Sequence, residues 1–361
     1  MALSTAAAFL AGACEELRGA LAASGRDPFL TGLDAVSASR KMRGGWRVRC
    51  RAANRGAEGW EIELEAGSLV LATGAREPPD RLLREVVAGG PLLPRFAGKV
   101  VQSSALLSPA GAAAAVGRLA AGAAPNVAIV GGSHSAVACA RLLLDDSPGL
   151  RFGEGGVTVL HRHPLRLTYA SEAAALAEGY TAFGPADVCA RTGRVFPLAG
   201  FRSDARDLLR RAWGIGGCGP EPRLRLHRLG RGPDAEAERI LAEADLIVAA
   251  LGYRPRALPL FDAEGQRIVL HAETAAGAAL VDARSRVLAA DGSPLEGVFG
   301  IGLAAGFPLR GTHGETSFEG QANGLSLWHG EIGAAIVRDL LAARPETAER
   351  RMPVLAATGC A

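Results

Sequence analysis

Hydrophobic and polar positions follow two different periods along the chain. Near the start, apolar residues recur every three or four positions, which predicts a helix over residues 5–23. Three short segments then alternate between apolar and polar residues, and glycine-rich turns separate them, which predicts a small antiparallel β meander at 33–36, 46–50 and 60–64. An apolar run at 68–72 ends this part of the chain, and Thr73 and Gly74 follow it directly.

A different pattern begins at Pro125. The segment 127–130 is apolar without alternation, a helix is predicted over 137–144, and 157–160 is a second apolar strand at the distance that a strand–helix–strand crossover needs. Strands that are apolar on both faces are typical of a parallel sheet covered by helices on both sides. The middle of the chain is therefore predicted to be a doubly covered α/β unit.

The remaining segments are less regular. We expect an alanine- and glycine-rich helix over 105–122 and an irregular insertion over 163–222 that contains a charged helix at 203–213. Further strands are predicted at 224–226, 244–250 and 297–302, and a final helix is predicted over 320–341. The residues after Pro345 are expected to form a tail.

Composition limits the class of protein. The 361 residues are 48% hydrophobic and 21% charged, which excludes intrinsic disorder and leaves room for about two domains. The 40 Lys+Arg residues nearly balance the 37 Asp+Glu residues, and no basic cluster stands out, so we expect no nucleic-acid partner. The apolar start carries Glu15, Glu16 and Arg18 and lacks a basic leader, so neither a signal peptide nor a membrane span is expected.

The cysteines bear on the cellular compartment. The 6 of them lie far apart, without the spacing of a zinc site or of a redox-active pair. This pattern favours a cytoplasmic protein without a metal site.

The turn after the first apolar strand carries the clearest chemical signal. It fits the dinucleotide fingerprint G-x-G-x-x-G/A at its first and last positions, and a serine replaces the middle glycine. The first glycine permits a tight turn, a small third residue lets the backbone approach a pyrophosphate, and the last small residue lets helix and strand pack closely. The free N–H groups of the helix start would face the phosphates. A tight turn without a ligand is the alternative interpretation. The residues of the turn are Gly131, Gly132, Ser133, His134, Ser135 and Ala136.

Arg162 bears on the choice of dinucleotide. It follows the second apolar strand, where the adenosine ribose lies in such a fold. An acidic residue there selects a free 2′-hydroxyl, whereas arginine accommodates a 2′-phosphate. Because no Asp or Glu occurs between Val157 and Leu167, we predict NADP(H) rather than NAD(H). The alternative is that Arg162 is a solvated surface residue.

Hydrolysis by a nucleophile is a weaker interpretation of the same turn. Ser133, His134 and Ser135 are adjacent at a helix start and cannot form a nucleophile, a base and an orienting group by themselves. No G-x-S-x-G elbow occurs in the chain, so hydrolysis is set aside.

Taken in order, these motifs resemble flavoproteins with two dinucleotide-binding domains, the superfamily of flavin-dependent monooxygenases and pyridine-nucleotide oxidoreductases. The likeness rests on segment 71–74 with Pro78, on the Gly131 turn, on segment 249–255 and on the late glycine-rich strand. Within the superfamily, the turn, Arg162 and the insertion after it are similar to NADPH-dependent N-hydroxylating monooxygenases of the lysine/ornithine type.

The resemblance implies an α/β fold class in which a Rossmann-like NADP-binding domain is inserted in a partial FAD-binding domain with a small antiparallel β meander. The first part of the FAD-binding domain would span 1–124. The NADP-binding domain would span 125–260 and include the insertion 163–222. The second part of the FAD-binding domain with its C-terminal helix would span 261–345, and a tail would span 346–361.

Further cofactor-binding residues follow from the resemblance alone. Thr73 and Gly74 correspond to a crossover near FAD, and Gly252 and Tyr253 correspond to the end of the NADPH domain. Gly302 lies beside the flavin ribityl and pyrophosphate in the family. The candidate next to it is Leu303, which stands where the family usually has Asp.

The loop before the final helix holds two candidate catalytic residues, His313 and Glu315. In the family fold this loop would face the flavin ring, where polar groups could orient a substrate or stabilise charge on the flavin. The alternative is that they are hydrogen-bonded loop residues.

The start of the chain departs from the family. Its members begin with a strand and a G-x-G-x-x-G helix that hold the FAD pyrophosphate, and the 71 residues before Ala72 contain no such unit. Three explanations are open. The start codon was set too far downstream, a second copy or a partner chain completes the FAD site, or FAD binding has been lost.

The resemblance implies an FAD- and NADPH-dependent oxidoreductase, a monooxygenase that hydroxylates a nitrogen or sulfur of a small-molecule substrate. A dithiol reductase is excluded because no cysteine pair is present. The second hypothesis is a nucleotide-binding protein, a regulatory or partner subunit that has lost FAD and catalysis.

Overall fold

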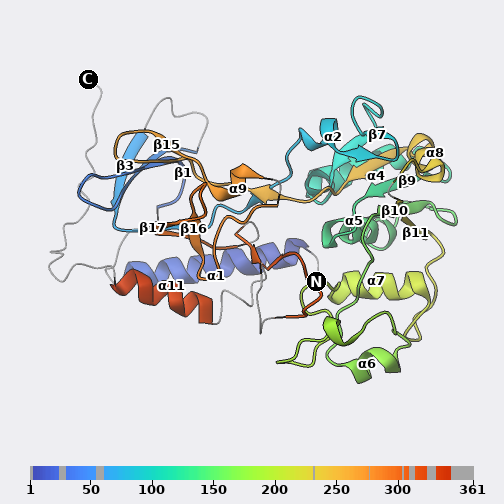
Figure 1. Cartoon of the computed structure of the whole chain (residues 1–361). Coiled ribbons are helices and arrows are strands. Elements are labelled where there is room, and N and C mark those ends of the chain that lie inside the picture. Colours follow the sequence, from blue (N-terminus) through green and yellow to red (C-terminus); the bar gives the residue numbers. More distant parts are fainter. Residues whose placement is uncertain are drawn as a thin grey trace. The chain divides into compact units, whose positions relative to one another are not determined.

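The computed structural model describes residues 3–23, 30–53, 61–230, 232–275, 277–302, 305–308, 314–322 and 331–342. The chain forms two compact units, each assembled from separate stretches of sequence (Figure 1). The first unit comprises Met1–Gly74, Arg256–Phe307 and Asn323–Ala361, and the second comprises Ala75–Pro255 and Pro308–Ala322. The predicted α/β class is confirmed, because the chain contains both parallel and antiparallel sheets with helices.

The second unit is built on a five-stranded, fully parallel sheet with the strand order β11-β10-β9-β12-β8. Every residue of β9, β10 and β12 is buried, because both faces of the sheet are covered, and this is why these segments lack polar alternation. The strands are β8 (Val100–Gln102), β9 (Val127–Val130), β10 (Val157–His161), β11 (Leu224–Arg228) and β12 (Leu246–Ala249).

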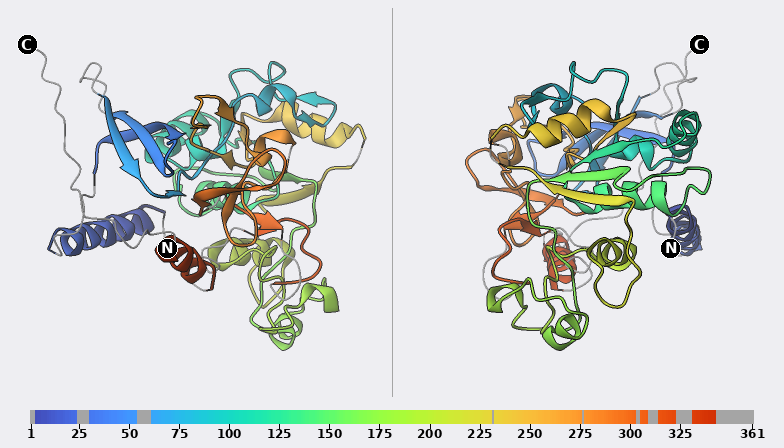
Figure 2. Two further views of the ribbon diagram at one scale, coloured as in Figure 1. Left: turned by 60° about the vertical axis from the view of Figure 1, so that its left-hand side comes forward. Right: turned by 90° about the vertical axis from the view of Figure 1, so that its right-hand side faces the viewer.

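Alternate residues of each strand serve two separate hydrophobic cores. In β9, Val127 and Ile129 belong to the core that includes α5 (His134–Leu144) and α7 (Ser203–Trp213). Ala128 and Val130 of the same strand belong to the other core, with α8 (Ala235–Glu243). Figure 2 shows α5 and α8 on opposite faces of the sheet.

The edge strand β8 was not predicted. Val100 pairs with Ile247 of β12, so a segment from before residue 125 completes the parallel sheet. For this reason the second unit begins at Ala75, ahead of the domain boundary predicted at 125.

The helix predicted over 105–122 is wrong as a single element. The structure has α3 (Ser103–Leu106) and α4 (Pro109–Leu119) instead. Pro109 has no N–H to continue α3, and it stands at the start of α4, where that N–H is not needed. Ser108 caps α4 by accepting a hydrogen bond from the Gly111 amide at 3.1 Å.

The insertion predicted over 163–222 contains α6 (Glu172–Ala177), the 3₁₀ turn η1 (Pro185–Asp187) and α7. Its interior is aromatic, with the rings of Tyr169 and Tyr180 stacked at a centroid distance of 5.3 Å. The other elements of the second unit are β5 (Ala75–Arg76), α2 (Arg81–Arg84), β6 (Val86–Val87), β7 (Gly90–Pro91), β13 (Arg254–Pro255) and β19 (Gln321–Ala322).

The first unit contains the predicted antiparallel meander. It forms part of a five-stranded sheet with the order β15-β14-β1-β2-β3. A second, three-stranded sheet has the order β16-β17-β4, in which β17 and β4 are parallel. The strands are β1 (Leu33–Arg40), β2 (Trp46–Ala52), β3 (Glu61–Ala66), β4 (Leu69–Leu71), β14 (Leu260–Phe261), β15 (Arg267–Ile268), β16 (Arg286–Leu288) and β17 (Pro294–Gly300).

The helices of the first unit that lie in the described residues are α1 (Leu3–Ala23), α9 (His271–Thr274) and α11 (Glu331–Ala342). The final helix was predicted from residue 320, but 321–322 form the extended strand β19 and the described helix begins at Glu331. Glycine has a low helix propensity, so Gly320 does not favour a helix at this position. The short strand β18 (Phe307–Pro308) stands where the chain passes from the first unit to the second. Of the helices in the described residues, none is long and apolar enough to cross a membrane.

Candidate functional site

The predicted dinucleotide turn lies between β9 and α5, at the carboxyl edge of the parallel sheet. From β9 the chain passes through α5 to β10 on one side, while β12 pairs with β9 on the other side. The strand order therefore reverses at β9. In open α/β sheets, ligands bind in the crevice outside the carboxyl ends of the strands at such a switch point.

Two glycines give the turn its shape. Gly131 has a φ of +142°, and a Cβ on it would lie 2.2 Å from the carbonyl oxygen of Ala250, directly after β12. A Cβ on Gly132 would lie 3.1 Å from the Cβ of His161, the last residue of β10. The turn passes between the ends of two neighbouring strands, where side chains have no room.

The start of α5 offers free backbone donors. Ser133 is the N-cap residue, and its side chain makes no capping hydrogen bond. Its carbonyl oxygen accepts hydrogen bonds from Ala136 at 3.0 Å and from Val137 at 3.2 Å. Among the hydrogen bonds of the described residues, none engages the amides of Ser133, His134 and Ser135. These amides, together with the positive end of the helix dipole, suit an anion.

The small residue at the end of the turn and the histidine within it have different roles. Ala136 is fully buried, which lets α5 pack closely on the sheet. The ring of His134 packs against Phe201 at a centroid distance of 4.7 Å. Desolvation lowers the pKa of His134, and the positive charge of Arg202 lowers it further. The imidazole is therefore neutral at neutral pH and can donate only one N–H.

Arg162 lies one residue beyond β10 and lines a pocket of about 1080 Å³ at the carboxyl ends of β10 and β11. Arg228, the last residue of β11, lines the same pocket. The Arg162 guanidinium donates to Glu85 Oε1 at 3.2 Å and to the carbonyl oxygen of Val86. An acidic residue therefore lies beside Arg162 although none is near it in sequence.

Gly252 and Tyr253 follow β12 and reach the same edge of the sheet. Gly252 has a φ of +88°, in the region that favours glycine. Arg81 donates to the carbonyl oxygens of Leu251 and Gly252, the latter at 3.4 Å. The Tyr253 side chain is exposed.

The other predicted cofactor residues belong to the first unit. Thr73 and Gly74 follow β4, and Gly302 follows β17. Because β4 and β17 are parallel, these strand ends lie at one edge of the three-stranded sheet, and the Ile301 amide donates to the Leu71 carbonyl at 3.0 Å. Leu303 and His313 lie outside the described residues.

The two units differ in what they offer a dinucleotide. The second unit has a strand, a glycine turn without room for side chains and a helix start with free amides, which fits a pyrophosphate. In the described residues of the first unit, no strand runs through a glycine turn into a helix. The residues described there therefore do not supply the pyrophosphate cradle that FAD would need.

Glu315, the second catalytic candidate, is buried at 2% exposure. Its carboxylate accepts hydrogen bonds from the amides of Leu198 at 3.0 Å and Ala199 at 2.7 Å. Two residues further on, the amide of Ser317 donates to the Ala186 carbonyl at 2.9 Å. This geometry ties the 314–317 segment to the insertion, which corresponds to the alternative of a hydrogen-bonded loop residue.

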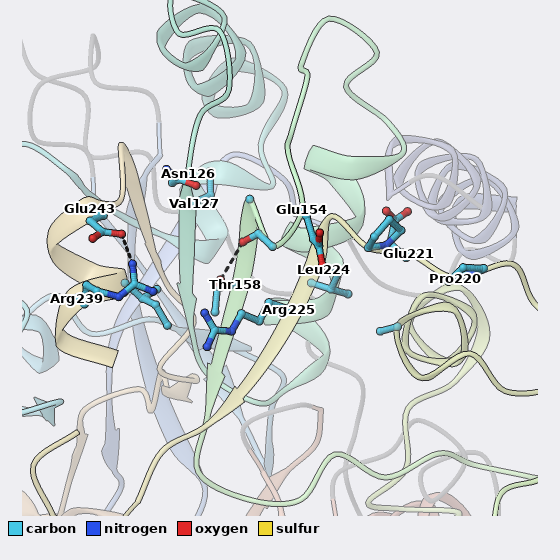
Figure 3. A pocket seen from close by; sticks show the side chains of 15 residues that line it. Asn126, Val127, Glu154, Thr158, Pro220, Glu221, Leu224, Arg225, Arg239 and Glu243 are labelled. Atoms are coloured by element: carbon cyan, nitrogen blue, oxygen red, sulfur yellow. Dashed lines mark hydrogen bonds and ion pairs between the residues drawn. The ribbon is translucent and has the colours of Figure 1, made fainter. Parts of the chain in front are cut away.

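A second pocket, of about 670 Å³, lies at the amino ends of β9, β10 and β11, the opposite edge of the sheet from Gly131 (Figure 3). Its arginines are already paired: Arg239 contacts Glu243 at 2.5 Å, and Arg225 contacts Glu236 at 2.8 Å. In the described part of the chain, no group of three or more His, Cys, Asp or Glu side chains is placed to hold a metal ion.

The strand order and the turn define the second unit as a Rossmann-like α/β fold. No family model matches the chain. The chain is 36% identical over 222 residues to a CMP-5′-(3-aminopropyl)phosphonate hydroxylase from Streptomyces rubellomurinus (strain ATCC 31215). That match covers 60% of this chain and 50% of the relative, so the chain spans about half the length of the curated relative it matches.

Three solved structures overlay loosely on most of the chain. They are an ornithine hydroxylase from Pseudomonas aeruginosa (TM-score 0.41, 14% identity, 86% of this chain and 69% of that one), an L-lysine 6-monooxygenase from Pseudomonas syringae (TM-score 0.42, 15% identity, 86% and 70%) and a FAD-dependent pyridine nucleotide-disulphide oxidoreductase from Desulfovibrio vulgaris (TM-score 0.37, 17% identity, 86% and 60%). Their names match the families that the sequence resembles.

Proposed function

We propose that this chain is a cytoplasmic NADPH-dependent oxidoreductase of the flavin monooxygenase type, which hydroxylates a nitrogen or sulfur of a small molecule. The observation that carries the proposal is the Gly131 turn. At this turn, Ala250 and His161 lie so close to the two glycines that no side chain would fit. The turn leads directly into the start of α5, whose first amides are free. The flavin part of the proposal rests on the sequence resemblance and on the hydroxylase relative.

Different residues of the second unit would bind different parts of NADPH. The amides of Ser133, His134 and Ser135 would hold the pyrophosphate, and Arg162 would face the 2′-phosphate. The turn at Gly131 and Gly132 would let the pyrophosphate approach the protein backbone closely. When bound, NADPH supplies a hydride, and this chain would bind and orient it and exclude water from the reacting atoms.

The name of the sequence relative guides the substrate class. That protein is a hydroxylase of an aminopropyl phosphonate carried on CMP, as its name states. A primary amine is a nitrogen nucleophile, so we favour a small molecule with a primary amino group among the nitrogen and sulfur substrates.

The test begins with the purified full chain. We expect it to be yellow or to take up added FAD, to bind NADPH with measurable affinity by titration calorimetry, and to show flavin absorption that NADPH bleaches without oxygen. A colourless chain that binds no FAD would contradict the proposal of a flavin-dependent enzyme. A chain that binds no NADPH would contradict the proposal as a whole.

The second candidate is a regulatory or partner subunit that binds NADP(H) without flavin or turnover. The observation that favours it is the lack of a pyrophosphate cradle in the described residues of the first unit. The same titrations separate the two candidates, because this one requires NADPH binding without FAD uptake. FAD uptake only after a second protein is added would indicate a partner chain that completes the site.

A further inference from the structure

The guanidinium of Arg162 is not free to receive a phosphate. One of its nitrogens donates to Glu85 Oε1 at 3.2 Å, and another donates to the carbonyl oxygen of Val86. The Arg162 side chain is 46% exposed and that of Glu85 is 22% exposed, and Arg162 lines the pocket together with Val86, the neighbour of Glu85. Arginine meets phosphate and carboxylate with the same donors. A bound 2′-phosphate would therefore compete with Glu85 for Arg162.

Glu85 is itself held in place from the other side. Its second carboxylate oxygen accepts from Arg81, which lies four residues earlier, at the start of α2. Arg81 in turn donates to the carbonyl oxygens of Leu251 and Gly252 after β12. Glu85 thus joins the end of β10 to the end of β12, and its carboxylate has little freedom to move away from Arg162.

The position of this carboxylate changes the expected cofactor preference. An acid at the end of the second strand accepts a hydrogen bond from a free 2′-hydroxyl, whereas arginine favours a 2′-phosphate. Sequence reasoning found only the arginine, because Glu85 is 77 residues away along the chain. The fold places both groups at one point.

We propose that Glu85 is a specificity-determining residue of the dinucleotide site, which offsets the charge of Arg162 and thereby narrows the preference for NADPH over NADH. With NADH, the carboxylate is available to the 2′-hydroxyl. With NADPH, the same carboxylate competes with the 2′-phosphate for the Arg162 guanidinium. Glu85 acts on the 2′-phosphate through Arg162, so for that ligand it is a positioning residue. The inference rests on the proposed dinucleotide binding.

The experiment compares the dissociation constants of NADPH and NADH, measured by titration calorimetry on the full chain and its variants. Wild type should bind both dinucleotides. Glu85→Gln should raise the ratio of NADPH affinity to NADH affinity about fivefold, the effect of removing a partly exposed charge of opposite sign to Arg162. Arg162→Ala should lower the ratio. In the Arg162→Ala background, Glu85→Gln should raise it by a clearly smaller factor, because there is no longer a guanidinium for which carboxylate and phosphate compete.

The matched control is Glu243→Gln. Glu243 is also paired with an arginine, Arg239, but at the amino edge of the same sheet. Its substitution should leave the ratio unchanged. A melting curve of each variant verifies that it is folded. If Glu85→Gln is unstable because Arg81 loses its partner, Glu85→Asp replaces it. The shorter aspartate keeps the negative charge but moves it away from Arg162, so this variant should raise the ratio by a smaller factor.

An unchanged or lowered ratio in a folded Glu85 variant would overturn the inference, as would an equal rise in the Arg162→Ala background. If wild type binds neither dinucleotide, the proposed function fails instead. The two failures are therefore distinguishable.

Discussion

Single carboxylates in this chain show how burial and partners decide what a residue can do. Glu315 was a catalytic candidate because its loop would face a flavin ring in related proteins. The structure gives both of its oxygens backbone partners, Leu198 and Ala199, and nearly complete burial. A carboxylate that is buried and bonded in this way holds the insertion to the 314–317 segment.

Replacing Glu315 by Gln tests this role. A glutamine has one acceptor oxygen and an NH₂ group that would face a backbone N–H, so one charge-assisted hydrogen bond is lost. We expect the free energy of unfolding to fall by about 1 to 2 kcal/mol, measured by urea denaturation. NADPH affinity of the folded variant should stay within twofold of wild type, because the turn at Gly131 is untouched.

Glu319→Gln is the control for that substitution. Glu319 is exposed and lies in the same segment of chain. We expect it to change stability by less than about 0.5 kcal/mol. A loss of turnover in Glu315→Gln without any loss of stability would restore Glu315 as a catalytic candidate.

Among single residues, the sequence indicates those whose structural role depends on their neighbours along the chain. Gly131 and Ser133 could be predicted because the strand before them and the helix after them mark a strand-to-helix turn. Glu85 and the partners of Glu315 could not, because their contacts join segments that are 77 and more than one hundred residues apart. No spacing pattern records such pairs.

Among the elements, the strand–turn–helix of β9 and α5 was the best predicted part of the chain, since buried parallel strands are apolar at every position. The strand β8 escaped prediction because it has only three residues, all half-buried, and shows neither alternation nor a long apolar run. The break between α3 and α4 was missed, although Ser108 followed by Pro109 is a recognisable helix start.

The turn between β9 and α5 makes a prediction at this scale. In Gly131→Ala, the new Cβ would overlap the Ala250 carbonyl and the residue would be held at a positive φ. β9 and β12 would have to separate, or the turn would have to change shape. We expect a loss of about 2 kcal/mol or more in unfolding free energy and a loss of NADPH binding.

The control is Gly149→Ala in the same unit. A Cβ on Gly149 would meet open space, and the residue has no positive φ, so alanine should be neutral or slightly stabilising there. Urea denaturation and titration calorimetry give both quantities. Unchanged stability and NADPH affinity in Gly131→Ala would contradict the close approach of the two strand ends.

The whole molecule consists of two units whose chain segments alternate along the sequence. The sequence resemblance led us to expect an NADP-binding domain inserted at 125–260. It did not place the change from the first unit to the second at Ala75, because that position depends on the pairing of β8 with β12. Both hydrophobic cores of the parallel sheet lie within the second unit.

Two buried cysteines report on the two units separately. Cys50 lies in β2 of the first unit and is 4% exposed, whereas Cys139 lies in α5 of the second unit and is fully buried. Burial raises the pKa of the Cys139 thiol to about 12, so at pH 8 it carries almost no thiolate in the folded state. Each should react with N-ethylmaleimide only when its unit unfolds, whereas the exposed Cys14 should react without denaturant.

Pulsed labelling along a urea series, read by mass spectrometry, then tests where the nucleotide binds. NADPH at one hundred times its dissociation constant stabilises the folded state that binds it by about 2.7 kcal/mol. We expect the labelling midpoint of Cys139 to move to higher urea and that of Cys50 to stay, because the Gly131 turn belongs to the second unit. Equal shifts would mean that both units unfold in one step, and a shift of Cys50 alone would move the binding site to the first unit.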